Sequence, residues 1–339
     1  MEVILLSEVS PKRLTSSEIG SLWTTYMQNS LSQRVLSYFL GHVQDTDIKP
    51  HVQTAYNQAV QNLDTIRDIF STEEIPVPFG FSEQDVNVQA ARLFEDTFFL
   101  IYLKQMGKAG LPQYGLLQSM ANRQDVNSFF SSCLTNTSNL FYQVNETLLS
   151  KGLLIRSPHI PTPKKNEFIQ DKNYFDGNSL MGKKRPLNAI EISHLYSNIQ
   201  TNVVGSMLAI GFGQTAKSQK IRDYMDRGKD IAQKHIRVFG DLLLESDLLV
   251  PMTWDASATD STDHVFSDKL MMFHFSMLMT GGLGNYGAAI ATSPRSDLGL
   301  KYTRLSAEIA KYAKEGANIM VENGWFEEPP QAADRTHLM

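Results

Sequence analysis

The sequence predicts an all-α protein that consists of two tandem four-helix bundles. The first observation is an internal repeat, because residues 14–19 return in similar form at residues 187–192, 173 positions later. The second is the helical spacing of apolar residues in both copies, without convincing strand alternation or a hairpin turn in either. The third is the pattern of connections between helices, which is short, long and short in each copy.

The repeat extends over nearly the whole chain. Phe39 matches Phe212 at the same shift, which becomes 172 after one residue is lost in a polar loop. Beyond that point the motif Gly-Leu-x-x-Tyr-Gly at residues 110–115 matches the same motif at residues 282–287. A match of this length with a single slip indicates a duplicated domain rather than a short solenoid repeat.

In the first copy, apolar residues at helical spacing predict four helices. Their expected ranges are 15–43, 46–71, 89–121 and 124–151. Thr15 or Ser16 can cap the first helix, and Glu18 can complete a capping box with Thr15. Asp45 or Thr46 is the expected cap of the second helix.

The second copy repeats this pattern. Its expected helices span 188–216, 218–245, 261–292 and 296–323. Gly152 and Gly324 follow the last helix of each copy, where glycine commonly ends a helix. Asp125 and Asp297 are expected as N-caps of the fourth helices, each paired with the arginine two residues before it.

Connection lengths predict how the helices of each copy are joined. Short links make the first and second helices antiparallel neighbours, and likewise the third and fourth. The links between the second and third helices are long, at about 72–88 and 246–260. At ~3.3 Å per extended residue, such a link can run the whole length of a helix ~40 Å long. One long crossover between two helical hairpins is the ferritin-like arrangement.

We therefore expect a division of the chain into four parts. These are a first bundle at 10–156, a linker at 157–186, a second bundle at 187–327 and a polar tail at 328–339. Proline, glycine and lysine mark the linker. Duplicated domains often bury a pseudo-twofold face much as homodimers do, so we expect the bundles to pack on each other. The sequence leaves a homo-oligomer open as well.

Composition excludes several classes of partner. A net charge of −5 provides no electrostatic reason to bind nucleic acid. No apolar run approaches the ~20 residues of a membrane span, and the start lacks the basic region of a signal peptide, so we expect a cytoplasmic protein. Cys133 is the only cysteine, which excludes an internal disulfide and fits a reducing compartment. We interpret it as a small core residue.

Histidines of the second copy are the sharpest candidates for a chemical site. His194, His235 and His274 lie on three of its predicted helices, and Glu191 precedes His194 in a Glu-x-x-His pair. Ferritin-like carboxylate proteins use such pairs to hold two iron or manganese ions, and imidazole with carboxylate also suits zinc. The candidate ligands of an iron, manganese or zinc ion are therefore Glu191, His194, His235 and His274. No catalytic residues and no other cofactor are indicated.

A structural interpretation of the same residues is favoured. The first copy has Ser21, Asn62 and Tyr102 at the three histidine positions, and neither copy has a second Glu-x-x-His. Glu308 could contribute, but it lies beside the apolar stripe of its helix. Glu191 matches Glu18, and both occupy a first helical turn, where a carboxylate favours the helix dipole. We therefore expect buried histidines that are hydrogen-bonded to tyrosine, asparagine or backbone groups.

Residues 282–287 also spell the dinucleotide-binding pattern G-x-G-x-x-G. That pattern requires a strand before it and a helix that opens at it, whereas this segment lies inside a predicted helix. The first copy has Pro112 where Gly284 stands, and proline lacks the backbone donor of a phosphate loop. We interpret the glycines as packing features that let a neighbouring helix approach. A small-molecule pocket beside residues 110–115 or 282–287 is a weaker hypothesis.

Over almost its whole length the chain resembles the DUF3231 family of Bacillus-type spore-forming bacteria. The resemblance rests on long strings at residues 14–23, 94–99, 185–191, 251–254, 267–274 and 322–325. It implies a ferritin-like helical fold, and it implies no activity and no catalytic residues.

The leading functional hypothesis is a non-enzymatic structural or interaction protein of the cytoplasm or the developing spore, because neither copy holds a complete catalytic set. The first alternative is a metal-binding protein or a metal-dependent oxidase with its site in the second bundle. The second alternative is a helical bundle that binds a small molecule.

Overall fold

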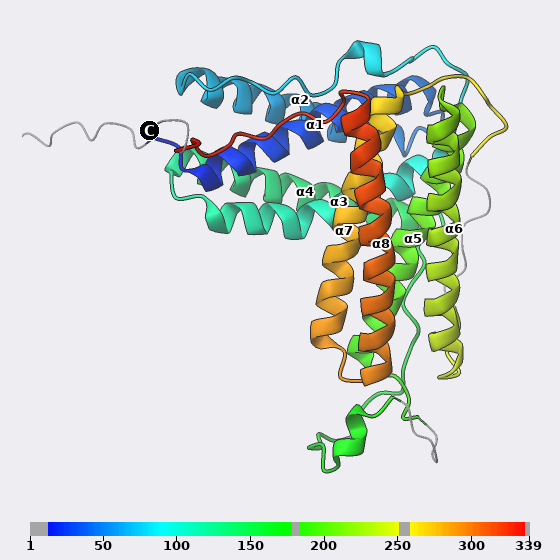
Figure 1. Ribbon diagram of the computed structural model, residues 1–339. Coiled ribbons are helices and arrows are strands. Elements are labelled where there is room, and N and C mark those ends of the chain that lie inside the picture. The colour runs from blue at the N-terminus through cyan, green and yellow to red at the C-terminus, as the bar shows by residue number, and fades with distance from the viewer. Residues whose placement is uncertain (1–12, 178–183, 251–257, 336–339) are drawn as a thin grey trace, which may run out of the picture.

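The computed structural model describes residues 13–177, 184–250 and 258–335 (Figure 1). The α-helices of this part are α1 (Ser16–His42), α2 (Lys49–Thr72), α3 (Asp96–Met120), α4 (Gln124–Ser150), α5 (Ala189–Thr215), α6 (Gln219–Leu244), α7 (Asp268–Thr292) and α8 (Ser296–Glu322). Two short 3-10 segments are η1 (Glu83–Asp85) and η2 (Lys172–Phe175). The described residues form isolated β-bridges but no β-strand, so the protein is all-α.

Two helices begin later than the sequence pattern predicts. We expected the third helices from 89 and 261, whereas α3 begins at Asp96 and α7 at Asp268. The residues before them are extended and pair with the opposite half of the molecule, as in the bridges Val86–Phe266 and Phe94–Ala258. Phe94 and Phe266 are buried between the halves, and tertiary pairing therefore outweighs local helix propensity.

Helix ends match the sequence expectations in part. Thr15 and Glu18 form the predicted capping box at the start of α1. The expected cap of α2 is wrong, because α2 begins at Lys49 without a side-chain cap. Asp125 and Asp297 are not N-caps either. Each lies in the first turn of its helix and pairs with the arginine at the N-cap position.

The second and third helices of each half run in the same direction. Asp96, at the start of α3, accepts a 2.6 Å hydrogen bond from the backbone N–H of Asp45, just before α2. Asp268, at the start of α7, accepts a 3.0 Å bond from the backbone N–H of Ser218, just before α6. Because both starts lie at one end of the bundle, the connection at 73–95 in the first half must return along its length.

The two halves cross at a steep angle (Figure 1). Helices α1–α4 lie across the upper part of α5–α8, and one apolar core continues from α1 and α3 into α5 and α7. A second, smaller apolar cluster stays within the first half, between α1, α2, α3 and α4. No helix in residues 13–177, 184–250 and 258–335 is apolar over a length that could cross a membrane.

Contacts between the halves are reciprocal. The N–H of Asn87 donates to the carbonyl of Val265 at 2.7 Å, and the N–H of Thr259 donates to the carbonyl of Leu93 at 2.8 Å. Asn87 and Thr259 occupy the same repeat position, and so do Leu93 and Val265. Each copy therefore donates from the first position and accepts at the second. Such exchange is the mark of a twofold interface, which exists here within one chain.

A glycine at this interface provides a test of how tightly the halves fit. A Cβ at Gly211 of α5 would lie 2.4 Å from the ring of Phe94, whereas a Cβ at Gly205 of the same helix would meet nothing within 4 Å. We expect Gly211→Ala to lower the free energy of unfolding by about 1–3 kcal/mol, because the ring must move within a packed core.

The matched control is Gly205→Ala, which we expect to raise the free energy of unfolding by about 0.5–1 kcal/mol through helix propensity. Urea denaturation of both variants measures the two changes. Equal effects of the two substitutions would contradict the close approach of Phe94.

Candidate functional site

The predicted ligand Glu191 is committed to holding the start of α5. Its carboxylate is fully buried and accepts two hydrogen bonds from the Arg185 guanidinium at 2.9 and 2.7 Å. It also accepts from the backbone N–H groups of Asn188, at 2.9 Å, and Arg295, at 3.1 Å. Burial alone would raise the pKa of Glu191, but these donors outweigh it and hold the pKa below its usual range.

His194 lies apart from this carboxylate, near the surface. Its side chain is half-buried, and its Nε2 shares a 2.7 Å hydrogen bond with the hydroxyl of Thr292 at the end of α7. Partial burial lowers the pKa of His194. The Glu-x-x-His pair therefore divides into a carboxylate bound by arginine and a histidine that joins α5 to α7.

His235 stands at the centre of the second bundle. Its side chain is fully buried. Nδ1 lies 2.9 Å from the hydroxyl of Tyr286 on α7, and Nε2 lies 3.0 Å from a carboxylate oxygen of Glu308 on α8. Asn202 of α5 donates its amide to the Tyr286 hydroxyl at 2.9 Å. Four helices thus meet in one hydrogen-bonded chain.

The charge states of these side chains define the direction of the hydrogen bonds between them. Burial, only partly offset by Glu308, lowers the pKa of His235, so its imidazole is neutral at pH 7. Lys234 donates to both oxygens of Glu308, at 2.8 and 2.9 Å, and helps to keep the pKa of that carboxyl low against burial. An ionised carboxylate only accepts. Nε2–H therefore donates to Glu308, and Nδ1 accepts from the hydroxyl of Tyr286.

The first bundle has a neutral counterpart at the same repeat positions. Asn62, which matches His235, donates to the side-chain oxygen of Asn29 at 3.0 Å. The Asn29 amide reaches the hydroxyl of Tyr114 at 3.5 Å. Cys133 is buried and donates its thiol to Asn62 at 3.4 Å. Each bundle therefore has a polar cluster at its centre, and only that of the second bundle pairs a histidine with an ionised carboxylate.

His274 lies between the two halves instead of inside one. It is 5% exposed, and its Nε2 is 3.1 Å from the hydroxyl of Tyr102, the residue that matches it in the repeat. Its Nδ1 has no hydrogen-bond partner among the described residues. The ring of Phe212 packs at 5.5 Å between centroids. Burial in this aromatic environment lowers the pKa of His274 to about 4.

The structure does not bring the four predicted ligands together. Glu191 is bound by arginine, and His194, His235 and His274 each have different partners on different elements. Within residues 13–177, 184–250 and 258–335, no group of three or more histidine, cysteine, aspartate or glutamate side chains could hold a metal ion. Glu308 is the carboxylate that actually meets a histidine. The sequence pattern did not predict this contact, because Glu308 lies beside the apolar stripe of its helix.

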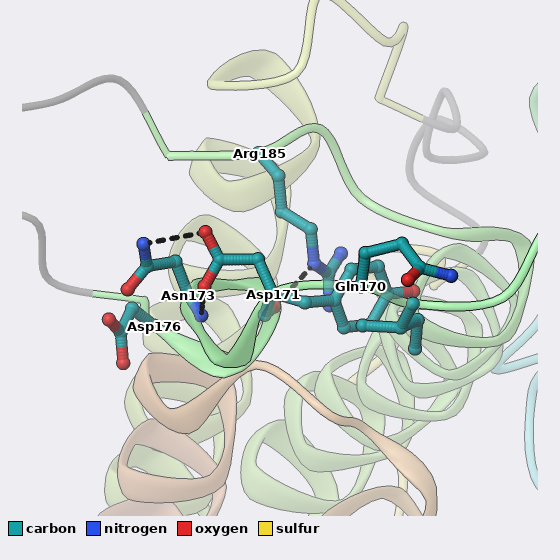
Figure 2. A pocket seen from close by; sticks show the side chains of 7 residues that line it. Gln170, Asp171, Asn173, Asp176 and Arg185 are labelled. Carbon is teal, nitrogen blue, oxygen red and sulfur yellow. Dashed lines mark hydrogen bonds between the residues drawn. The ribbon is translucent and has the colours of Figure 1, made fainter.

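An open depression of about 610 Å³ lies outside the second bundle, on the segment before α5 (Figure 2). It is lined by Ile169, Gln170, Asp171, Asn173, Tyr174, Asp176 and Arg185. Arg185 is the cation of this surface, yet its guanidinium binds Glu191 and stacks 4.0 Å above the ring of Tyr174. Because its charge is already paired, we interpret the depression as the outer side of a structural anchor.

The glycine motif has a more limited packing role than we predicted. Residues 110–115 and 282–287 lie inside α3 and α7, which continue through them. A Cβ at Gly110 would be 3.2 Å from Thr137, so this glycine does allow close approach. Gly115, Gly284 and Gly287 face open space, so packing does not explain them. Neither of two open depressions on the described surface is lined by these segments.

Comparison with known proteins relates both halves of the chain to one family. The sequence model of the family described as "Protein of unknown function (DUF3231)" matches residues 7–165 and again residues 175–338. A solved structure of a "putative spore coat protein" from Bacillus halodurans C-125 aligns at 20% identity and a TM-score of 0.38. The alignment covers 46% of this chain and 98% of that one. No curated protein matches the chain.

The buried histidines predict a loss of stability in mild acid. The pKa of His274 is about 4 in the folded protein, against an ordinary value of about 6.5 in the unfolded chain. The unfolded state therefore binds more protons between these values. The contribution of a neutral His274 to the free energy of unfolding is fully present above pH ~6.5, and it falls by up to about 1.4 kcal/mol per pH unit as the pH decreases to ~4.

Urea midpoints between pH 5 and 7 measure this slope, and His274→Gln should make it shallower. His194→Gln is the comparison, because that ring is only half-buried and its loss should change the slope less than the loss of His274. If the slope is the same in wild type and His274→Gln, then His274 is not held neutral by burial.

Proposed function

We propose that this chain, which belongs to the DUF3231 family, is a non-enzymatic structural or interaction protein whose two ferritin-like bundles act as one rigid unit. The division into bundles at 10–156 and 187–327, with a linker and a polar tail, is part of this proposal. So is its place of action, the cytoplasm or the developing spore. The observation that carries the proposal is the continuous core between the halves.

Polar contacts reinforce that core on both sides. Ser267 donates its hydroxyl to Asp85 at 2.6 Å, and Lys269 donates to the carbonyl of Gly80 at 2.8 Å. Asp263 accepts from the backbone N–H of Ala91 at 2.9 Å. Hydrogen bonds at the edge of an apolar core fix the orientation of surfaces that already pack together. They support a protein whose two halves present a constant geometry to a partner.

The segments that follow the two bundles add a further connection. The segment after α4 lies on α5, where Tyr196 donates its hydroxyl to the carbonyl of Ile155. The segment after α8 lies on the first half, where Glu327 accepts from the backbone N–H groups of Phe79, at 2.7 Å, and Gly80, at 3.1 Å. The segment that follows each half is therefore hydrogen-bonded to the other half.

If the halves form one rigid unit, the protein should unfold in a single calorimetric transition. Phe94→Ala removes a fully buried ring from between the halves, at a cost of about 3–5 kcal/mol. We expect this variant to unfold in two separated transitions.

The matched control is Phe130→Ala, which removes an equally buried ring from the cluster within the first half. We expect it to lower the transition temperature while unfolding stays a single step. Two independent transitions in the wild-type protein, or identical behaviour of the two variants, would overturn the rigid-unit proposal.

The rival hypothesis is a metal site in the second bundle, and the contact of buried His235 with half-buried Glu308 is the observation that keeps it testable. The protein is purified without a histidine tag, and iron, manganese and zinc are measured by mass spectrometry. His235→Asn is the chosen variant because asparagine occupies the matching position, Asn62, in the first bundle. His194→Ala is the control.

We expect no stoichiometric metal in any of the three proteins. One metal ion per chain in the wild type and the control, lost in His235→Asn, would replace the structural proposal with a metal-binding function.

A further inference from the structure

Two lysines on α3 face the second bundle, and no carboxylate of the described residues pairs with them. Lys104 and Lys108 are four residues apart, so both lie on one side of the helix. Both are half-buried. Burial lowers the pKa of Lys104, and burial followed by repulsion from Lys104 lowers the pKa of Lys108 to about 8. No carboxylate in the described part of the chain offsets either effect.

The surroundings of Lys108 are polar. Lys108 donates to the carbonyl of Ser197 on α5 at 2.7 Å and to the hydroxyl of Thr201 at 3.0 Å. Gln105 of α3 donates its amide to the same hydroxyl at 3.3 Å. An ammonium group has three donors. Within the described part of the chain, one donor of Lys108 and all three of Lys104 therefore have no protein acceptor at the point where α3 packs against α5.

The fold itself does not require these lysines. At the corresponding positions of the second copy, α7 has Ser276 and Thr280, which are neutral and shorter. Removing an ammonium group from water without a counter-charge is unfavourable, and placing two such groups together adds repulsion. An arrangement that costs stability and that the other copy avoids is most simply explained by an anion that binds there.

We propose that Lys104 and Lys108 form a binding site for a phosphate group at the crossing of α3 and α5, with Gln105 and Thr201 holding Lys108 in place. A phosphate dianion neutralises two ammonium groups at once and accepts the donors that remain free. A carboxylate carries a single charge and leaves one lysine unpaired. Lysine is a common point-charge ligand of phosphate.

Isothermal titration of the full-length protein with inorganic phosphate tests the proposal at low ionic strength. A second titration uses glycerol phosphate, to distinguish the free ion from a phosphate ester, and a third uses acetate. We expect saturable binding of one phosphate group per chain and weaker binding of acetate. In the double variant Lys104→Gln/Lys108→Gln, affinity should fall by about tenfold or more, since charge-assisted hydrogen bonds are lost.

The matched control is Lys311→Gln/Lys314→Gln, which removes the same charge from two exposed lysines of α8. It should bind phosphate as the wild type does.

A second measurement avoids substitution altogether. Phosphate should slow the acylation of Lys104 and Lys108 in the wild-type protein, as measured by mass spectrometry. It should leave the acylation rate of Lys311 unchanged.

Three outcomes would overturn the proposal. They are no saturable binding and no protection, acetate binding as tight as phosphate binding, and equal loss of affinity in both double variants. The site is independent of the proposed structural role, which calorimetry tests without phosphate.

Discussion

The burial of Phe94 and Phe266 between the two halves is the interaction on which the rest of the structure depends. Both rings are almost completely excluded from solvent, and they occupy the same repeat position. Phe94 lies against Gly211, and Phe266 packs on Tyr38 at 5.4 Å between ring centroids. Because apolar burial is the main favourable term in folding, these contacts hold the preceding segments extended and thereby set where α3 and α7 begin.

Duplication has allowed one polar cluster to change its chemistry while the scaffold stays the same. Tyr114 and Tyr286 have matching asparagine partners in the two bundles. The next residue in the cluster is Asn62 in one bundle and His235 in the other. The histidine needs a carboxylate acceptor, which Glu308 provides, and Lys234 balances that carboxylate. A buried polar group is stable only when every partner is present, so these substitutions form a connected set.

The sequence pattern indicates residues of the second bundle's centre but not their grouping. His235 is buried, as expected, and its partner is Glu308. The same helical spacing places His194 and His274 at plausible positions on their helices, although neither meets His235. Helical spacing shows which side of a helix a residue occupies. It does not show the height at which neighbouring helices align, which depends on how α5–α8 pack around the interface.

The sequence by itself determined the duplication, the eight helices and the capping box of α1. These features depend on local spacing and on chemistry within a few residues, which a linear pattern records directly. Tertiary structure alone decided where α3 and α7 begin, which partner each histidine meets and how the halves cross. Those outcomes depend on contacts between residues far apart in the sequence, such as His235 with Glu308 and Asn87 with Val265. Their stability comes from shared burial, which no single segment contains.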